Sequence, residues 1–346
     1  MVRASNDYVC QNCGAAHAKW GGRCVDCGGW NTIVEETRQA STSKKLGAAK
    51  GRQISLEELA SSKRTVKRIQ TGLAEFDRVV GSGLVAGSAN LISGDPGIGK
   101  STLVLQAVCA IARATHSCIY ISGEESADQV RLRARRLGLD QNQVRLAATT
   151  NVNDILATLL SSEAPQVLVI DSIQTMYVDH IGSVPGTVSQ VRASAQELIK
   201  YAKIQGVALI LVGHVTKEGQ VAGPRVLEHM VDVVLHFEGD HRTQNRLLRA
   251  AKNRFGATDE VGVFEMTEAG LSEVDNPSAL FLGSRCAPVS GLTVFAGLEG
   301  SRPMLVEIEA LVTPSLAGTP RRAVVGLDGA RLAMIVAVLD SRCGLT

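Results

Sequence analysis

A chain of 346 residues with 45% hydrophobic and 20% charged side chains has an ordinary globular composition and is long enough for two or three domains. The net charge of +2 says little about partners, and aromatic residues make up only 3%, so the cores must be built from aliphatic side chains. No apolar run reaches the length of a membrane span, and the polar N-terminus lacks the features of a secretory signal. We therefore predict a cytoplasmic protein with no membrane partner.

Four of the eight cysteines lie in the first 27 residues, as two Cys-x-x-Cys pairs. Cys10 and Cys13 form the first pair; Cys24 and Cys27 form the second, after ten intervening residues. Two such knuckles present four thiolates to one ion, and Zn²⁺ is the expected occupant because it favours sulfur ligands and four-coordination. A redox-active cysteine pair and a rubredoxin-like iron site are the alternatives. We predict a compact zinc module over residues 1–36.

Three other residues of this module have side chains that can bind a metal or stack on a base. His17 lies between the cysteine pairs, and because four cysteines complete the site we interpret it as a bystander. Trp20 and Trp30 are the two tryptophans of the chain. We expect them to cover the metal site in preference to stacking on nucleic-acid bases.

Residues 37–53 are rich in Ser, Thr, Lys, Gly and Ala without periodicity, which predicts a flexible linker. Between Arg38 and Arg68 there are nine Lys or Arg against two Glu. This basic stretch is equally consistent with a solvated linker and with a nucleic-acid contact. A short segment over 54–59 then leads into the next domain.

The sequence from Gly94 to Ser101 fits the P-loop pattern G-x-x-x-x-G-K-[ST]. An apolar strand over 89–93 precedes it and an amphipathic helix over 100–113 follows, which is the context that the motif needs. Backbone N–H groups and the helix N-terminus would bind the phosphates of ATP or ADP, with Lys100 on the β- and γ-phosphates and Ser101 on Mg²⁺. A glycine-rich turn that binds nothing is the alternative. The predicted nucleotide-binding residues are Gly94, Asp95, Pro96, Gly97, Ile98, Gly99, Lys100, Ser101 and Thr102.

After the P-loop helix, apolar strands alternate with helical patterns. The expected strands are 117–122, 144–148, 167–171 and 207–212, and the expected helices are 126–137, 154–161 and 188–204. This alternation predicts an α/β domain with a mainly parallel sheet and helices on both faces. Ligands of such sheets bind at the carboxyl ends of the strands.

Three acidic residues and one histidine follow these strands. Asp171 ends an apolar strand and fits a Walker B acid, which would hold Mg²⁺ beside the phosphates. Glu124 is the candidate general base that polarises the attacking water. An N-cap or first-turn role is its alternative, and Glu125 is an alternative base. His214 would either sense the γ-phosphate or serve as an ordinary polar loop residue.

From Val233 onward the pattern changes to strands joined by tight turns, at 233–237, 246–251 and 261–266. Lys252 and Arg254 lie between the last two, at a spacing that places both on the same side of an extended chain. They would insert into a phosphate site on a neighbouring subunit as arginine fingers do, or form a solvated surface hairpin.

Together these motifs resemble the bacterial RadA (Sms) family of DNA repair and recombination ATPases. The resemblance covers nearly the whole chain. Besides the cysteine pairs and the P-loop, it rests on Gly28–Thr32, Thr71–Leu73, Glu75–Arg78, Ser122–Ser126, Gly213–Lys217, Ala222–Met230 and the segment Lys252–Gly256, which is a signature specific to the family.

The resemblance implies a RecA-type P-loop ATPase core, here over residues 54–274, that assembles as a hexameric ring. It also implies a DNA-stimulated ATPase that binds single-stranded and branched DNA and acts as a helicase-like motor in branch migration, alongside the recombinase RecA. Lys252 and Arg254 would act across the subunit interface. Loops 173–187 and 215–225 would face the centre of the ring, with Lys217 and Arg225 contacting DNA phosphates.

The family also ends in a domain similar to that of Lon protease, and residues 275–346 match only its beginning. We expect this region to be truncated, to expose apolar strand edges and to weaken oligomerisation. Two other functions remain open: a RecA-fold ATPase that regulates a protein partner, and an ATP-dependent protease-like ring. The cofactors expected are ATP or ADP, Mg²⁺ and Zn²⁺.

Overall fold

The computed structural model describes residues 6–37, 67–214, 225–239, 244–282, 290–314 and 322–344. The chain divides into two compact units, Met1–Pro277 with Gly297–Met304, and Ser278–Ala296 with Leu305–Thr346. The predicted linker beyond Thr37 and the segment at 54–59 lie outside the described residues.

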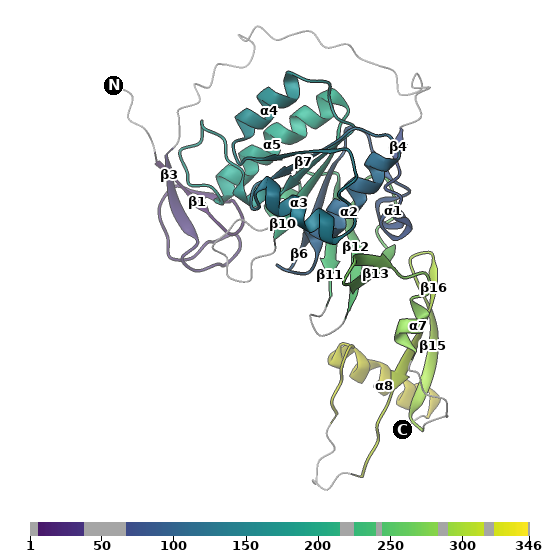
Figure 1. Ribbon diagram of the computed structural model, residues 1–346. Helices are drawn as coiled ribbons and strands as arrows, with labels where there is room; N and C mark the ends of the chain where they lie inside the picture. The colour runs from purple at the N-terminus through teal and green to yellow at the C-terminus, as the bar shows by residue number, and fades with distance from the viewer. Residues whose placement is uncertain are drawn as a thin grey trace, which may run out of the picture. The chain divides into compact units, whose positions relative to one another are not determined.

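The N-terminal module is a three-stranded antiparallel sheet in the order β2-β1-β3 (Figure 1). Its strands are β1 (Asn6–Cys10), β2 (Ala16–His17) and β3 (Ile33–Thr37). Among the described residues of this module, the buried core consists of Cys10, Cys24 and Ile33, and a core this small needs a metal ion at the cysteines to be stable. The expectation that the tryptophans cover this site is wrong, because Trp20 is 62% exposed and Trp30 is 71% exposed.

A nine-stranded sheet forms the centre of the ATPase core, in the order β14-β13-β12-β11-β6-β10-β9-β7-β8 (Figure 1). The six strands from β11 to β8 are parallel neighbours, and β12 to β14 add an antiparallel extension. The strands are β6 (Ala89–Gly94), β7 (Cys118–Ser122), β8 (Val144–Ala148), β9 (Val167–Asp171), β10 (Ala208–His214), β11 (Val233–Glu238), β12 (Asn245–Asn253), β13 (Val261–Thr267) and β14 (Gly270–Glu273).

Helices cover both faces of this sheet, which confirms the predicted layer architecture (Figure 1). Alternate strand residues point to opposite faces, so Val167 and Val169 pack with one set of helices and Leu168 and Ile170 with the other. The first set is α1 (Ala74–Val80), α2 (Lys100–Arg113) and α3 (Ala127–Arg136), and the second is α4 (Val152–Leu160) and α5 (Val188–Gln205). Shorter elements are β4 (Arg68–Ile69), β5 (Leu84–Val85), the 3₁₀ helix η2 (Ile173–Thr175) and α6 (Arg225–Glu228).

The C-terminal region holds α7 (Ser278–Phe281), a two-stranded sheet of β15 (Leu292–Glu299) and β16 (Arg302–Glu309), and α8 (Gly329–Cys343). Helix α8 begins at its N-cap Asp328, whose side chain accepts a hydrogen bond from the backbone of Arg331. None of its residues is buried. Apolar side chains of both strands, such as Phe295 and Ile308, are also exposed.

Candidate nucleotide site and metal centre

The P-loop joins the end of β6 to the start of α2 and leaves little space around its backbone. A Cβ atom at Gly94 would lie 2.2 Å from the carbonyl oxygen of Phe237 on the neighbouring strand, so only glycine fits there. Arg246, at the start of β12, donates a hydrogen bond from Nε to the carbonyl oxygen of Ile98 at 3.1 Å. This contact ties the tip of the loop to the antiparallel extension of the sheet.

Lys100 is 3% exposed, and its ammonium donates to the carbonyl oxygens of Gly94 at 2.8 Å and Asp95 at 2.9 Å. Burial lowers the pKa of Lys100 to about 8, and the nearby carboxylates of Asp171, Glu124 and Asp95 offset only part of that shift. The loop therefore holds an amine that loses its proton more readily than a free lysine, at the position where the motif places phosphate oxygens. A bound phosphate would favour its charged form.

The parallel register brings the predicted functional side chains together at the carboxyl ends of the strands. His214 pairs with Gly94 across β10 and β6, and Asp171 pairs with Val212 of β10 and with Ser122 of β7. Strand β10 thus places His214 between the P-loop and the Walker B strand. The prediction that these residues meet at the carboxyl edge is supported by this arrangement.

Asp171 is 6% exposed, and its carboxylate accepts a hydrogen bond from the hydroxyl of Tyr120. Burial raises the pKa of Tyr120 well above its usual value, so the hydroxyl remains a donor. Nη2 of Arg133 in α3 donates to the same hydroxyl oxygen at 3.4 Å. Tyr120 and Arg133 therefore fix the orientation of the acid. The carboxylate of Asp171 and the hydroxyl of Ser101 in the first turn of α2 are oxygen donors of the kind that Mg²⁺ prefers.

Glu124 is linked to two residues at the tips of other strands. Its carboxylate accepts hydrogen bonds from the hydroxyl of Ser172 and from Nε2 of His214, the latter at 3.1 Å. The hydrogen bond from His214 is the main cause that lowers the pKa of Glu124 to about 2, with further help from Ser172 and Lys100 against the opposing effect of burial. Gly123 allows this approach, because a Cβ atom there would lie 2.1 Å from the hydroxyl oxygen of Thr175.

The structure distinguishes Glu124 from its sequence alternatives. Glu125 forms an ion pair with Arg133 at 2.8 Å, and its backbone N–H donates to the hydroxyl of Ser122 at 3.0 Å. The N-cap of α3 is Ser126, in a capping box with Gln129. Glu125 thus stabilises the loop through Arg133 and Ser122. Glu124 is the carboxylate that, with Asp171, lies close enough to Lys100 to act on its charge.

Lys252 and Arg254 lie near the amino-terminal ends of the parallel strands, whereas the P-loop of their own chain lies at the carboxyl ends. Asn253 is aligned with Val233, which is aligned with Asn90 near the start of β6. Gly94 is four residues further along that strand, or about 13 Å away at about 3.3 Å per residue. Strand β12 extends to Asn253, so Lys252 belongs to the strand and not to a turn.

Both cations contact the end of α6 or the residues that follow it. The ammonium of Lys252 donates to the carbonyl oxygens of Glu228 at 2.7 Å and Val231 at 2.8 Å. Nη1 of Arg254 lies 3.1 Å from Oδ1 of Asp232, and the arginine side chain is 57% exposed. Asp232 is buried, and its other carboxylate oxygen accepts the backbone N–H of Ala89 at 3.1 Å. The ammonium of Lys252 is therefore hydrogen-bonded within its own chain. The guanidinium of Arg254 has an ion pair with Asp232, but its side chain is largely exposed to solvent.

Two predicted DNA-binding residues are not placed. Lys217 lies outside the described residues, and Arg225 begins α6 without a described side chain. The loop after Asp171 is described, and it starts with η2. The amide of Gln174 in this 3₁₀ helix donates to the carbonyl oxygen of His214 at 3.3 Å, so the two strand tips are connected.

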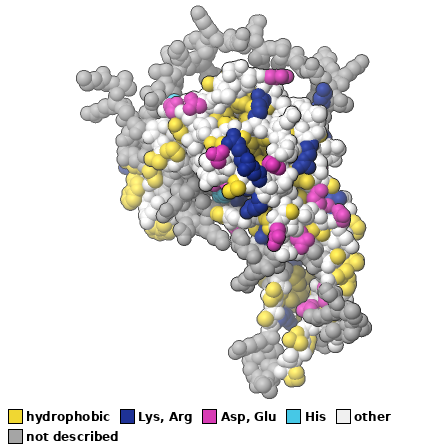
Figure 2. Space-filling view, in the orientation of Figure 1, with side chains coloured by type: hydrophobic (Ala, Val, Ile, Leu, Met, Phe, Trp, Pro, Cys, Tyr) yellow, Lys and Arg dark blue, Asp and Glu magenta, His cyan; other side chains and the backbone are white. Residues whose placement is uncertain are grey.

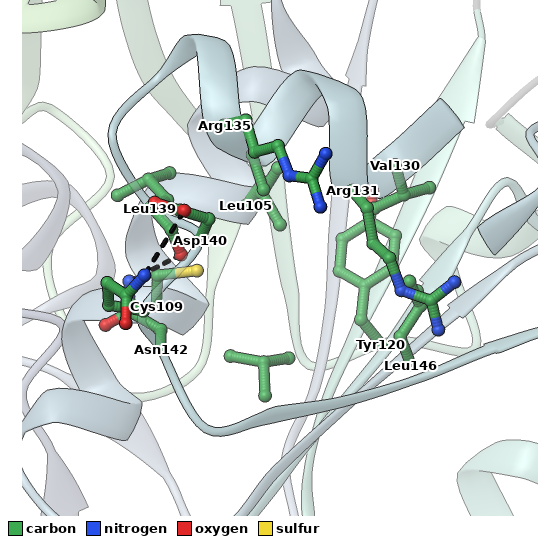
Figure 3. A pocket seen from close by; sticks show the side chains of 13 residues that line it. Leu105, Cys109, Tyr120, Val130, Arg131, Arg135, Leu139, Asp140, Asn142 and Leu146 are labelled. Carbon is green, nitrogen blue, oxygen red and sulfur yellow. Dashed lines mark hydrogen bonds between the residues drawn. The ribbon is translucent and has the colours of Figure 1, made fainter. Parts of the chain in front are cut away.

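A cavity of about 420 Å³ lies behind Tyr120, between α2, α3 and the strands β7 and β8 (Figure 3). Its walls combine apolar side chains, such as Leu105 and Val130, with polar ones that include Arg131 and Arg135. No P-loop residue lines it, so it is separate from the nucleotide site. The arginines belong to the basic, outward-facing side of α3 that is visible in Figure 2.

The four predicted metal ligands come together in the N-terminal module. All four sulfur atoms lie within 4.8 Å of one another, with 3.6 Å between Cys10 and Cys27 and 3.7 Å between Cys13 and Cys24. A tetrahedral zinc ion with bonds of about 2.3 Å separates its sulfur ligands by about 3.8 Å, so the site fits zinc. Nε2 of His17 lies 3.4 Å from the sulfur of Cys24, beside a set of ligands that is already complete.

Sequence reasoning missed the residues that position the predicted ones. Tyr120, Arg133 and Ser172 orient the two acids, Arg246 supports the P-loop, and Asp232 holds Arg254. Each of these contacts joins segments that are distant in sequence or depends on the register between strands. One local signal was available: Tyr120 lies two residues before the end of β7, the strand that pairs with β9 and Asp171.

Two family models match the chain. A zinc-ribbon model described as a rubredoxin metal binding domain matches residues 8–35, and a model of AAA domains matches residues 56–220. A solved structure, that of a KaiC-like protein from Pyrococcus horikoshii, is 20% identical and has a TM-score of 0.50, covering 61% of this chain and all of that one. That likeness shows a shared fold. Within the described residues, no helix is both long and apolar enough to cross a bilayer.

Full-length similarity extends to curated bacterial proteins. Those called DNA repair protein RadA in Brucella abortus, Pseudomonas aeruginosa and Bacillus subtilis are 56%, 52% and 46% identical to this chain. In each case the alignment covers all of this chain and 76% of the relative.

Proposed function

Because this chain belongs to the RadA family of DNA repair proteins, we propose that it is an ATP-driven motor that acts on single-stranded and branched DNA in recombination intermediates. Its P-loop domain makes it a DNA repair ATPase. The proposal adds that DNA stimulates hydrolysis, that the chain moves strands during branch migration together with the recombinase RecA, and that it does so in the cytoplasm.

Hydrolysis is assigned to the residues at the carboxyl edge of the sheet. Lys100 exchanges the carbonyl oxygens of Gly94 and Asp95 for phosphate oxygens when ATP binds. Ser101 and Asp171 would hold Mg²⁺, which would supply positive charge beside the phosphates. Glu124 orients and polarises the attacking water once its hydrogen bond from His214 is released, because a carboxylate with a pKa of about 2 is a weak base. His214 in turn reports on the γ-phosphate.

The observation that carries the proposal is the location of Lys252 and Arg254 at the edge opposite to their own P-loop. Neither side chain reaches the nucleotide of its own chain, and the exposed guanidinium of Arg254 is available to a second copy. A contact from this edge of one subunit to the P-loop edge of the next is heterologous, and it closes into a ring when the rotation is right. We propose a hexameric ring in which Arg254 completes the neighbour's site and Lys252 holds the segment that presents it.

Coupling to DNA is assigned to the loops that follow Asp171 and His214. Both begin at residues of the catalytic edge, and Gln174 connects them through the carbonyl oxygen of His214. Loss of the γ-phosphate would therefore change the conformation of both loops together. We propose that they line the ring centre and that Lys217 and Arg225 contact DNA phosphates there, which would make binding strongly dependent on salt.

The test is the ATPase rate with and without single-stranded DNA, measured on the wild type, Lys100→Ala and Arg254→Ala. Lys200→Ala and Arg131→Ala are the controls, since Lys200 is exposed on α5 and Arg131 is 58% exposed at a cavity that no P-loop residue lines. We expect DNA to raise the wild-type rate, both test variants to lose it and both controls to keep it. A rate that DNA leaves unchanged, together with an active Arg254→Ala, would refute the proposal.

A further inference from the structure

We infer that the two exposed tryptophans of the zinc module, with the cations beside them, form a base-stacking surface for single-stranded DNA. The inference rests on the proposed function for the presence of such DNA, and it adds a contact outside the ATPase core. The surface consists of Lys19, Trp20, Arg23 and Trp30, and we call it the indole surface. Figure 2 shows hydrophobic side chains exposed on this module, at the left of the view.

Neither ring belongs to the buried core of the module as the structure describes it. Trp20 is 62% exposed and Trp30 is 71% exposed, while the module's core is completed by Cys10, Cys24 and Ile33. Tryptophan is highly buried on average in folded proteins, so two such rings on the surface of one small module indicate a contact with another molecule. The low aromatic content of the chain makes their shared location more informative.

Trp30 is held in a defined position. It pairs with Arg23 in an antiparallel bridge, and the Arg23 guanidinium lies 5.8 Å from the centroid of its ring. Nε of Arg23 donates to the carbonyl oxygen of Gly28 at 3.1 Å, and the backbone N–H of Asn31 donates to Gly22 at 2.7 Å. A ring that is already oriented loses little freedom when a base stacks on it.

Within residues 6–37 the basic residues are Lys19 and Arg23, and three of the four acidic residues, Asp7, Glu35 and Glu36, lie on strands β1 and β3. Lys19 precedes Trp20 directly, and Arg23 lies against Trp30. Neither cation forms an ion pair within the part of the chain that the structure describes. A cation next to an aromatic residue, in space for Trp30 and in sequence for Trp20, matches the succession of base and phosphate along a single strand.

The chain offers a direct spectroscopic test, because Trp20 and Trp30 are its only tryptophans. The full chain, loaded with zinc, is titrated with a fluorescein-labelled oligothymidine while labelled-DNA anisotropy and tryptophan emission are recorded in parallel. We expect emission to be quenched with the same midpoint as the anisotropy rise. Trp20→Phe and Trp30→Phe assign the quenching to each ring, and zinc content confirms that each variant keeps its module.

Affinity provides the second readout. Stacking of one base is worth enough that Trp20→Ala or Trp30→Ala should weaken DNA binding about fivefold or more. Val25→Ala is the matched control, since Val25 is an apolar residue of the same module that is 85% exposed, and it should bind as the wild type does.

The outcomes separate this inference from the proposed function. If the oligonucleotide binds while emission stays constant and both alanine variants bind normally, the indole surface is a contact for a protein partner and the inference is overturned, although the motor proposal stands. If the oligonucleotide does not bind the chain at all, both fail. Quenching that tracks binding and is lost in the tryptophan variants supports both.

Discussion

Nucleotide binding should take up a proton near pH 8, because burial lowers the pKa of Lys100 to about 8. Phosphate oxygens favour the ammonium form, so binding restores the pKa to its usual range near 10 or above. The fraction of Lys100 that must gain a proton is then about 0.1 at pH 7, about 0.5 at pH 8 and about 0.9 at pH 9. Above pH 8, affinity should fall by up to about tenfold for each further pH unit.

Isothermal titration calorimetry with Mg²⁺ and a non-hydrolysable ATP analogue measures this uptake. Titrations at each pH in two buffers of different ionisation enthalpy give the number of protons from the dependence of the observed enthalpy on the buffer. Lys100→Arg is the control, since a guanidinium stays charged throughout this range and its uptake should vanish. Zero uptake at pH 8, with an affinity that does not change between pH 7 and pH 9, would refute the account of a buried, partly neutral lysine.

Three further predictions concern positioning and metal. Tyr120→Phe removes the hydrogen-bond donor to Asp171, and a hydrogen bond to a charged group is worth about 1.5–3 kcal/mol. We expect this variant to need an Mg²⁺ concentration about tenfold higher for half-maximal ATPase activity. Tyr201→Phe is the control and should have no effect, because the Tyr201 hydroxyl has no partner within the described residues. Asp232→Asn should lower the free energy of unfolding in urea by about 1–3 kcal/mol, because it weakens a buried acceptor of Arg254 and Ala89. Asp128→Asn, at an exposed ion pair, is the control and should lower it by less than about 0.5 kcal/mol. Equal effects of the two substitutions would contradict a special role for Asp232. Cys13→Ser and Cys27→Ser should lose zinc in elemental analysis while Cys343→Ser retains it, and unchanged zinc in the first two would exclude the four-cysteine site.

Much of the ATPase core was predictable because its strands and helices have strong local signals. Helix α2 has the predicted bounds, and the strands bearing Asp171 and Gly94 differ from the prediction by at most one residue. Buried parallel strands are continuous apolar runs, and a P-loop is specified by eight consecutive residues. The four-cysteine site was predictable for the same reason, since its spacing is local.

The residues that complete the site were not predictable, because their roles depend on register and on distant contacts. Tyr120 reaches Asp171 only because β7 pairs with β9 in a particular alignment, and Asp232 meets Arg254 through the pairing of β11 with β12. Burial of the tryptophans was a sound expectation for large apolar rings, but a core of three residues has no room for them.

The central claim, that one subunit completes the catalytic site of the next, is tested most directly by mixing two inactive variants. In a ring, the P-loop of an Arg254→Ala subunit and the arginine of a Lys100→Ala subunit form one intact site when they are neighbours in the right order. Random assembly of equal amounts makes about a quarter of all interfaces intact, so the DNA-stimulated ATPase rate should recover to about a quarter of the wild-type rate. If the mixture, after subunit exchange, stays as inactive as the separate variants, Arg254 does not act on a neighbouring subunit and the account is wrong.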